Sequence, residues 1–298
     1  MPVRVLAILT VLALAAGVAA LVACSGGGPS ASPSHASGQA ASPAPALPKT
    51  PRALSDRLAA ADLALRRAIR AWRVDGQPAR TSPPDEVAVR ARYVQRAMRL
   101  LSGRPRLAAA TIRRLPARLR RQSREVTGAM RDLRRLSAGW PPAQAVRTGP
   151  AEPLGKLLAY YRAAQRRFGV DWQVLAAVNL VESAYGRVRN DSVAGARGPM
   201  QFMPSTWRTY GLGGDIRSPR DAILGAANLL RHAGAPRNYA RALYAYNPSP
   251  LYVDAVRRYA RLIAGDRDAV YLLYSWGALA GTRHGSHHSA GRSHVSGK

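Results

Sequence analysis

Apolar residues recur three or four positions apart over residues 51–148, and this spacing narrows the possible folds more than any other feature. A period near 3.6 residues is the pattern of an amphipathic α-helix. Breaks rich in Gly and Pro fall at DGQP, SGRP and GWPP and favour turns. The apolar faces comprise Leu54, Leu58, Ala61, Leu65, Ile69 and Trp72, then Val87, Ala91, Val94, Met98 and Leu101, and then Val126, Ala129, Leu133 and Leu136. We therefore predict a helical region over residues 51–148.

The same region is strongly basic. Residues 51–149 contain 23 arginines and seven acidic residues, a net charge of +16 within a whole-chain charge of +29. Two interpretations follow: a helical bundle that supports the next domain, or a surface that binds anionic wall polymers or the membrane. Nucleic acid also suits such a charge, but the N-terminal sequence argues against that partner.

The N-terminus has the layout of a secretory signal. Arg4 precedes an apolar run over residues 5–22, and a small residue stands before Cys24. Residues 21–24, with the sequence LVAC, resemble the lipobox of bacterial lipoproteins, which implies lipidation of Cys24. Because the run is near the minimum length of a membrane-spanning helix, a permanent anchor is the alternative. Residues 1–24 thus predict export to the outer face of the cytoplasmic membrane or the cell envelope.

Two further segments have compositions typical of disorder. Residues 25–50 consist mainly of small residues and proline and predict a tether, and residues 282–298 form a tail rich in Gly, Ser and His. A short apolar element at residues 266–281 is expected to pack on the preceding domain. Cys24 is the only cysteine and no HExxH arrangement occurs, so we expect no disulfide framework, no metal and no cofactor.

Glu182 lies within an otherwise apolar helical stretch. Asp171 occupies an N-cap position and Gly186 the position of a left-handed C-cap, which predicts a helix over residues 172–185. Apolar residues on nearly every face predict that this helix is buried. Burial and the negative end of the helix dipole both disfavour a carboxylate, so the pKa of Glu182 should be raised. A protonated carboxyl group suits a general acid for glycosidic cleavage; a surface glutamate at a fraying helix end is the alternative.

Three short motifs then occur in order: ES at residues 182–183, SVAGARGPMQFMP at 192–204 and AYN at 245–247. Together they resemble the catalytic domain of bacterial lytic transglycosylases, over roughly residues 151–265. The resemblance implies a lysozyme-like helical fold, so the whole chain is expected to be mainly α. It implies that Glu182 is the catalytic acid. It also implies substrate binding by Ser183, Met200, Gln201, Tyr246 and Asn247.

The glycines of the second motif are expected to serve the substrate, because Gly195 and Gly198 let the backbone approach a flat sugar. This sequence departs from the family pattern at Pro199 and Phe202, where aliphatic residues are common. Compared with that pattern, one additional residue also lies between Glu182 and Ser192.

The resemblance implies that the substrate is the glycan strand of peptidoglycan. It also implies that the bond cleaved is the β-1,4 bond between N-acetylmuramic acid and N-acetylglucosamine, with closure of a 1,6-anhydro ring. A hydrolytic lysozyme on the same fold needs a second carboxylate, and Asp191 is the remaining candidate, because Asp215 and Asp221 are predicted in a turn and at a helix start. A wall-binding protein without activity is a third alternative. The sequence points to no particular protein partner.

Overall fold

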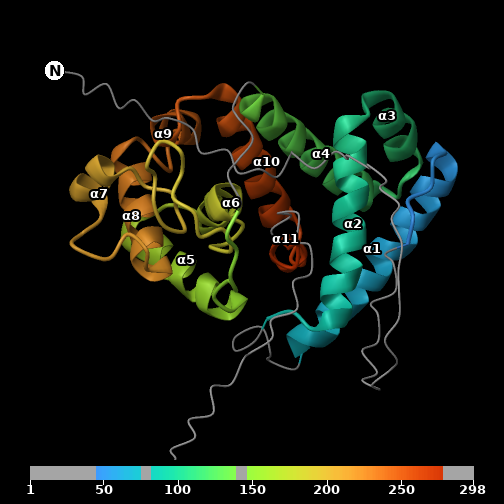
Figure 1. The fold of residues 1–298 in the computed structure, drawn as a ribbon, viewed down its shortest axis with the longest axis horizontal. Coiled ribbons are helices and arrows are strands. Elements are labelled where there is room, and N and C mark those ends of the chain that lie inside the picture. The colour runs from blue at the N-terminus through green and yellow to red at the C-terminus, as the bar shows by residue number, and fades with distance from the viewer. Residues whose placement is uncertain (1–44, 75–81, 139–145, 278–298) are drawn as a thin grey trace, which may run out of the picture.

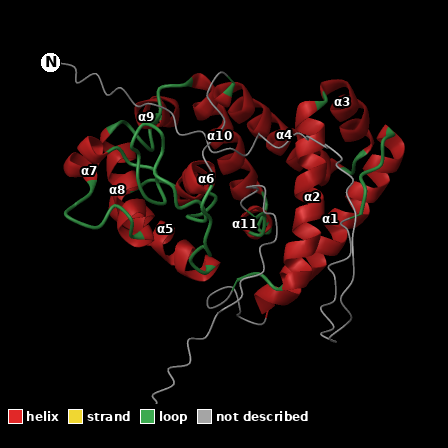
Figure 2. Ribbon diagram, in the orientation of Figure 1, coloured by secondary structure: helices red, strands yellow, loops and turns green. Residues whose placement is uncertain are grey.

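The computed structural model describes residues 45–74, 82–138 and 146–277, which form eleven α-helices (Figures 1 and 2). Within these ranges there is no β-strand, only isolated bridges between Thr148 and Val188 and between Arg197 and Phe202. The predicted mainly helical fold is therefore confirmed. None of the helices found in the described ranges has the length and apolar character needed to cross a membrane.

Several predictions concern residues outside these ranges. The predicted signal peptide at residues 1–24, Cys24, most of the predicted tether and the tail at residues 282–298 all lie outside the described residues. The last residues of the tether are described, and they approach the folded part. Leu47 packs against the core, and the carbonyl oxygen of Pro45 accepts a hydrogen bond from Arg96 (3.2 Å).

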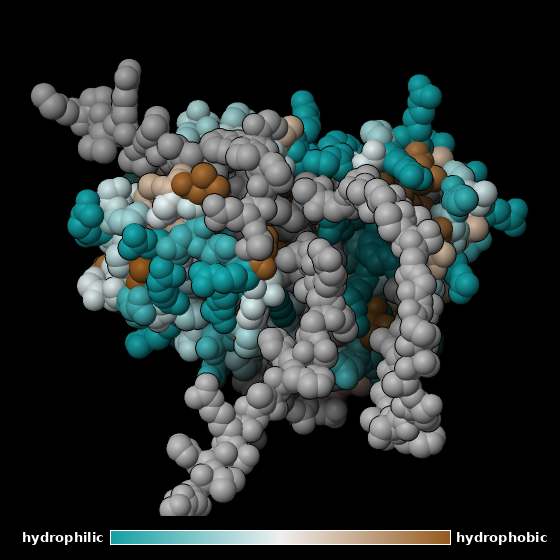
Figure 3. All heavy atoms as spheres, viewed as in Figure 1, coloured by the Kyte–Doolittle hydropathy of each residue, from teal (hydrophilic) through white to brown (hydrophobic). Residues whose placement is uncertain are grey.

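The basic region contains four helices: α1 (Pro51–Val74), α2 (Asp85–Gly103), α3 (Pro105–Arg114) and α4 (Ala117–Ser137). The predicted apolar faces of α1, α2 and α4 are buried, except that Ala61 is half-buried. The SGRP break separates α2 from α3, a short helix that begins with Pro105 and that the sequence pattern did not reveal. The outward side of these helices is largely hydrophilic in the view of Figure 3.

Seven helices follow: α5 (Leu154–Phe168), α6 (Trp172–Ser183), α7 (Pro204–Tyr210), α8 (Pro219–His232), α9 (Tyr239–Tyr246), α10 (Pro250–Gly265) and α11 (Ala269–Tyr274). Helix α6 is central, and every residue at 174–183 is buried, as its apolar sequence predicted. It packs against α5, α8 and α10. Helix α11 packs against α6 and α10 and also contacts α1 of the basic region.

Helix α10 joins the two regions, because one side packs on α6 and another on α4 (Figure 1). Three ion pairs line the contact with α4: Arg258 with Asp132 (3.2 Å) and with Glu125 (3.7 Å), and Arg261 with Glu125 (2.9 Å). The guanidinium group of Arg258 also lies over Gly128, where an added Cβ would come within 3.0 Å of it. The basic helices therefore pack together with α6 in one folded unit, through α10.

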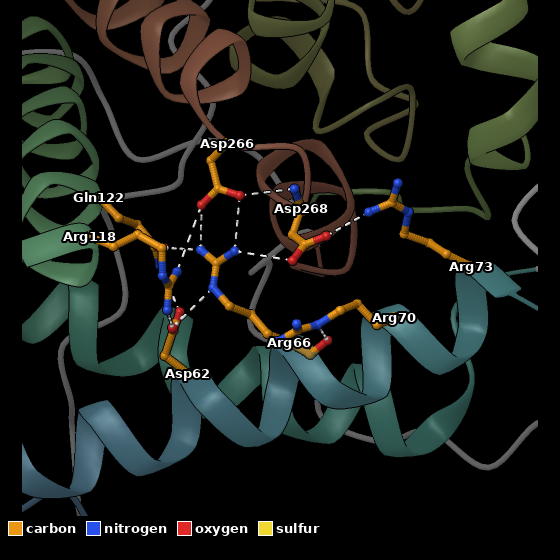
Figure 4. Close-up of polar contacts among 8 residues, drawn as sticks. All are labelled: Asp62, Arg66, Arg70, Arg73, Arg118, Gln122, Asp266 and Asp268. Carbon is orange, nitrogen blue, oxygen red and sulfur yellow. Dashed lines mark hydrogen bonds and ion pairs between the residues drawn. The ribbon is translucent and has the colours of Figure 1, made fainter. Parts of the chain in front are cut away.

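A buried cluster of charged residues forms a second contact between the basic helices and the rest of the fold, near the end of α10 (Figure 4). Arg66 on α1 is only 3% exposed. Its guanidinium group contacts Asp62 (3.1 Å), Gln122 (2.5 Å), Asp266 (2.7 Å) and Asp268 (3.4 Å), and Asp62 also accepts a hydrogen bond from Arg118 (2.6 Å). Burying a charge is costly unless it is paired, and here each charge has an opposite partner. The cluster links α1 and α4 to the turn between α10 and α11.

Candidate active site

Glu182 lies in the last turn of α6 with only 4% of its surface exposed. One carboxyl oxygen, Oε1, accepts a hydrogen bond of 2.7 Å from the hydroxyl group of Tyr252 on α10. Burial raises the pKa of Glu182 to about 8, although the hydrogen bond from Tyr252 acts to lower it. The carboxyl group is therefore mostly protonated at neutral pH, as a general acid requires.

The backbone turns sharply directly after Glu182. Helix α6 ends at Ser183, and Ala184, Tyr185 and Gly186 all have positive φ angles (50°, 63° and 80°). The prediction that the helix continues to residue 185 is therefore wrong by two residues. Two non-glycine residues occupy the left-handed region, a conformation that costs roughly 1 kcal/mol or more per residue. The surrounding contacts must hold this turn in place.

Ser183 provides those contacts. Its hydroxyl group donates to the carbonyl oxygen of Pro199 and accepts from the backbone N–H of Gly186 (2.7 Å). The side chain is fully buried, and it lies behind the wall of the cavity described next rather than on its surface. The ES motif thus couples the turn after the acid to the loop that carries Gly198 and Gln201.

Beside Glu182 is a cavity of about 470 Å³. Its wall is formed by the end of α6, the loop before α7, and parts of α7, α8 and α9. Its polar lining residues include Glu182, Gln201, Ser205, Thr206, Thr209, Tyr210, His232, Arg241, Tyr246 and Asn247. Glu182 supplies the only carboxyl group among the described residues that line it. The cavity combines one acid with many neutral hydrogen-bonding groups, which suits a sugar.

Two buried amide oxygens on this cavity have no hydrogen-bond partner among the described residues: Oε1 of Gln201 and Oδ1 of Asn247. The amide nitrogen of Gln201 is engaged, because it donates to the carbonyl oxygen of Gly198 (2.9 Å). A buried acceptor without a donor costs about 1–3 kcal/mol. Both oxygens are therefore available to accept hydrogen bonds from the hydroxyl or N–H groups of a ligand.

Tyr246 forms another part of the wall. Its hydroxyl group donates to the carbonyl oxygen of Met200 (2.6 Å), and its ring lies parallel to that of Tyr252, with centroids 6.4 Å apart. Met200 itself is fully buried and does not line the cavity. Of the residues that the resemblance assigned to substrate, Gln201, Tyr246 and Asn247 line the cavity beside Glu182, whereas Ser183 and Met200 support it from behind.

Gly198 has a different role from the predicted one. Its φ is +72°, and a Cβ at this position would lie 1.9 Å from the carbonyl oxygen of Ile216. The absence of a side chain is therefore required by the packing of two loops, and not by the approach of a sugar. Gly195 also has a positive φ (+88°), but the space around it is open.

The other candidate carboxylates lie elsewhere. Asp191 pairs with Arg217 (3.0 Å) and Arg197 (3.8 Å) and does not line the cavity. Asp221 lies at a helix start, where its N–H donates to the hydroxyl group of Ser218, as predicted. In the part of the chain that the structure describes, no three His, Cys, Asp or Glu side chains come together as a group that could hold a metal ion.

Comparison with known proteins gives two matches. A family model, the transglycosylase SLT domain, matches residues 159–263. The chain is also similar to the membrane-bound lytic murein transglycosylase F of Thiobacillus denitrificans, with 33% identity over 121 residues. That alignment covers 38% of this chain and 25% of the relative, so the chain spans about a quarter of the length of that curated protein. No solved structure matches.

Proposed function

We propose that this protein is a lytic transglycosylase that acts on peptidoglycan, because the model of the transglycosylase SLT domain matches residues 159–263. The bond cleaved is the β-1,4 bond between N-acetylmuramic acid and N-acetylglucosamine. The observation that carries the proposal is Glu182, a buried carboxyl group with a pKa of about 8 on a cavity whose polar lining is mostly neutral. The match to a protein named a lytic murein transglycosylase supports it.

In the first step, Glu182 gives its proton to the glycosidic oxygen that leaves with N-acetylglucosamine. Tyr252 holds the carboxyl group in place through its hydrogen bond to Oε1 (2.7 Å). The bond to C1 of the muramic acid breaks, and Glu182 becomes a carboxylate. Since the hydrogen bond from Tyr252 favours the charged form, it stabilises Glu182 at this stage.

In the second step, the carboxylate of Glu182 takes the proton of the C6 hydroxyl group of the same muramic acid. The C6 oxygen then bonds to C1 and closes the 1,6-anhydro ring, so that Glu182 is protonated again and no water is consumed. An internal nucleophile has a high effective concentration. This route needs no second carboxylate, which accords with Glu182 as the only carboxyl group among the described cavity residues.

The substrate is held by the groups that surround the acid. The unpartnered oxygens of Gln201 and Asn247 accept hydrogen bonds from sugar hydroxyl or acetamido N–H groups. The ring of Tyr246 forms an apolar surface for a sugar face. Ser183 and Met200 act indirectly, because their hydrogen bonds fix the turn after Glu182 and the position of Tyr246.

Digestion of purified sacculi tests this function. Mass spectrometry should detect muropeptides that are lighter by one water than those released by lysozyme. Products with a reducing end would assign the protein to the hydrolytic lysozymes. Binding without any product would favour the third alternative, a wall-binding protein that has no activity.

We also propose export and lipid anchoring through Cys24. The support is the signal-like sequence of residues 1–24 and the description of the relative as membrane-bound. In the producing cell, the mature protein should begin at Cys24 and carry lipid on that residue, as measured by mass spectrometry, and Cys24→Ser should remove the lipid. A parent protein that carries no lipid and keeps residues 1–23 would favour a permanent transmembrane anchor.

A further inference from the structure

Among the described residues that line the cavity beside Glu182 there is one arginine, Arg241. It lies in the first turn of α9, where its backbone N–H donates to Oδ1 of Asn238 (2.9 Å). No hydrogen bond or ion pair of its guanidinium group occurs within the described part of the chain. By contrast, Arg197 and Arg217 in the neighbouring loops share Asp191. Arg241 is exposed, and its charge is available to a ligand in the cavity.

The place of Arg241 along α9 defines which part of a ligand it meets. Arg241 and Ala245 are one helical turn apart and both line the cavity, and Asn247 follows at the end of the helix. Six residues of helix span about 9 Å. A ligand whose scissile bond lies at Glu182, beside Asn247, therefore reaches Arg241 with a more distant part.

The charge of Arg241 is unexpected for a site that binds only sugars. The glycan rings of peptidoglycan are neutral, and α7 offers them the neutral hydroxyl groups of Ser205, Thr206 and Thr209. The negative charges of this polymer lie on the peptide stems, which carry carboxylates. A guanidinium group binds a carboxylate through two parallel hydrogen bonds. Charge and geometry thus match the stem and not the glycan.

We propose that Arg241 binds a carboxylate of the peptide stem and makes the enzyme prefer stems with free carboxyl groups over amidated stems. This inference rests on the proposed function, since it names the substrate class of the same cavity. Arg241 is a specificity-determining residue here and takes no part in the proton transfers of Glu182.

The test uses two short glycans of alternating N-acetylglucosamine and N-acetylmuramic acid that differ only in the stem. One carries an alanyl-glutamate stem with free carboxyl groups, and the other carries the same stem fully amidated. Binding is measured with the full chain in the inactive Glu182→Gln background, with and without Arg241→Gln. Arg208→Gln, which removes an exposed arginine of α7 outside the cavity wall, is the matched control. Product formation is measured in parallel with an intact Glu182.

We expect the free-acid glycan to bind about fivefold more tightly than the amidated one, the range of an exposed ion pair. Arg241→Gln should abolish this preference, and Arg208→Gln should keep it. A preference that survives Arg241→Gln, or equal binding of both glycans by the parent protein, overturns the inference and leaves the proposed function standing. Selective binding without any product overturns the proposed function alone. If neither glycan binds, the inference is refuted, and if no product forms either, the proposed function is refuted with it.

Discussion

Around Arg66, the charged groups are paired with opposite charges at hydrogen-bonding distance (Figure 4). Around Glu182, the acid accepts one hydrogen bond from Tyr252, and the nearby amide oxygens of Gln201 and Asn247 lack donors among the described residues. Both clusters are buried, and α10 borders both: Tyr252 lies in its first turn and Asp266 directly after its end. The first cluster is complete without a ligand, and the second is not.

The pKa of the acid in each cluster reflects this difference. Burial acts to raise the pKa of Asp266, but hydrogen bonds from Arg66 and from the N–H of Asp268 outweigh it and hold the pKa below its ordinary value. No cation among the described residues contributes to the pKa of Glu182, so burial prevails and raises that pKa to about 8. The same chemical group is thus kept charged where it joins helices and neutral where a proton must be given away.

The largest expected effect comes from removing the proton donor. Glu182→Gln fills the same space but has no proton to deliver, so activity on sacculi should fall by at least ~10²–10⁴, measured from the rate of muropeptide release. Glu152→Gln is the control, since Glu152 pairs with Lys156 (3.4 Å) and lies outside the cavity. Substantial clearing of peptidoglycan by Glu182→Gln would contradict the assignment.

The stability of the same variant should depend on pH. The folded pKa of Glu182 lies above its ordinary value of 4.5, so the folded state loses stability as the pH rises from there to about 8. The amide that replaces the carboxyl group has no charge to bury. Glu182→Gln should therefore gain stability relative to the parent protein as the pH is raised from 5 to 9, as measured by denaturant unfolding. Asp266 has the opposite pH dependence. Because its folded pKa is lowered, its contribution to the stability of the folded state is lost as the pH falls below about 3.8.

Disrupting the charged cluster around Arg66 should lower the free energy of unfolding and leave the catalytic step unaffected. Arg66→Met leaves Asp62 and Asp266 buried without their main partner, which typically costs about 3–5 kcal/mol. The exposed neighbour Arg67 provides the control, since Arg67→Met removes the same charge from the surface of α1. Urea denaturation should show a large loss of unfolding free energy for the first variant only. An equal loss in both would mean that net charge, and not pairing, is responsible.

Tyr252 lies on α10, the helix that borders both clusters, and its substitution should have an intermediate effect. Tyr252→Phe removes a hydrogen bond that lowers the pKa of Glu182, so the alkaline limb of the pH–rate profile, set by the protonated acid, should move to higher pH. We expect activity to fall about tenfold, because hydrogen bonds to charged groups contribute about 1.5–3 kcal/mol. Tyr259→Phe, a buried tyrosine on the same helix, should leave that limb unchanged. An unshifted limb in Tyr252→Phe would reduce Tyr252 to a packing role.

These cases also separate what the sequence predicts from what it does not. The apolar faces of α1, α2 and α4 and the burial of Glu182 follow from local spacing, because a helix has a fixed period. Tyr252 lies 70 positions from Glu182 in the sequence, and Asp266 lies 200 positions from Arg66. The spacing of residues along the chain does not predict contacts between such distant positions. The left-handed turn at Ala184 was missed for a related reason: its cost is offset by Ser183 and Pro199, whose contact depends on the tertiary fold.

The exposed arginines of the basic helices carry a smaller expected effect, the retention of the protein on anionic wall polymers or membranes. Deleting the region is not a clean test, because α4 packs on α10. Substituting Arg113, Arg121 and Arg124, all exposed, with Gln avoids this problem. Binding to sacculi and anionic vesicles should weaken in the variant and with salt, because the Debye length falls from about 10 Å at 0.1 M to about 3 Å at 1 M. Binding indifferent to both would leave these helices a purely supporting role.

The smallest effect is expected at Asp191, and it decides the reaction type. A hydrolase needs a second carboxylate at roughly 5–9.5 Å from the acid to act as nucleophile or to activate water, and Asp191 was the remaining candidate. Its carboxylate instead pairs with Arg217 and Arg197 outside the cavity wall, and exposed pairs of this kind contribute only about 0–1 kcal/mol. Asp191→Asn should therefore keep most of the activity and still release products one water lighter than those of lysozyme. Loss of activity in Asp191→Asn, or reducing-end products from the parent protein, would place a water-activating carboxylate in the reaction and assign the protein to the hydrolases.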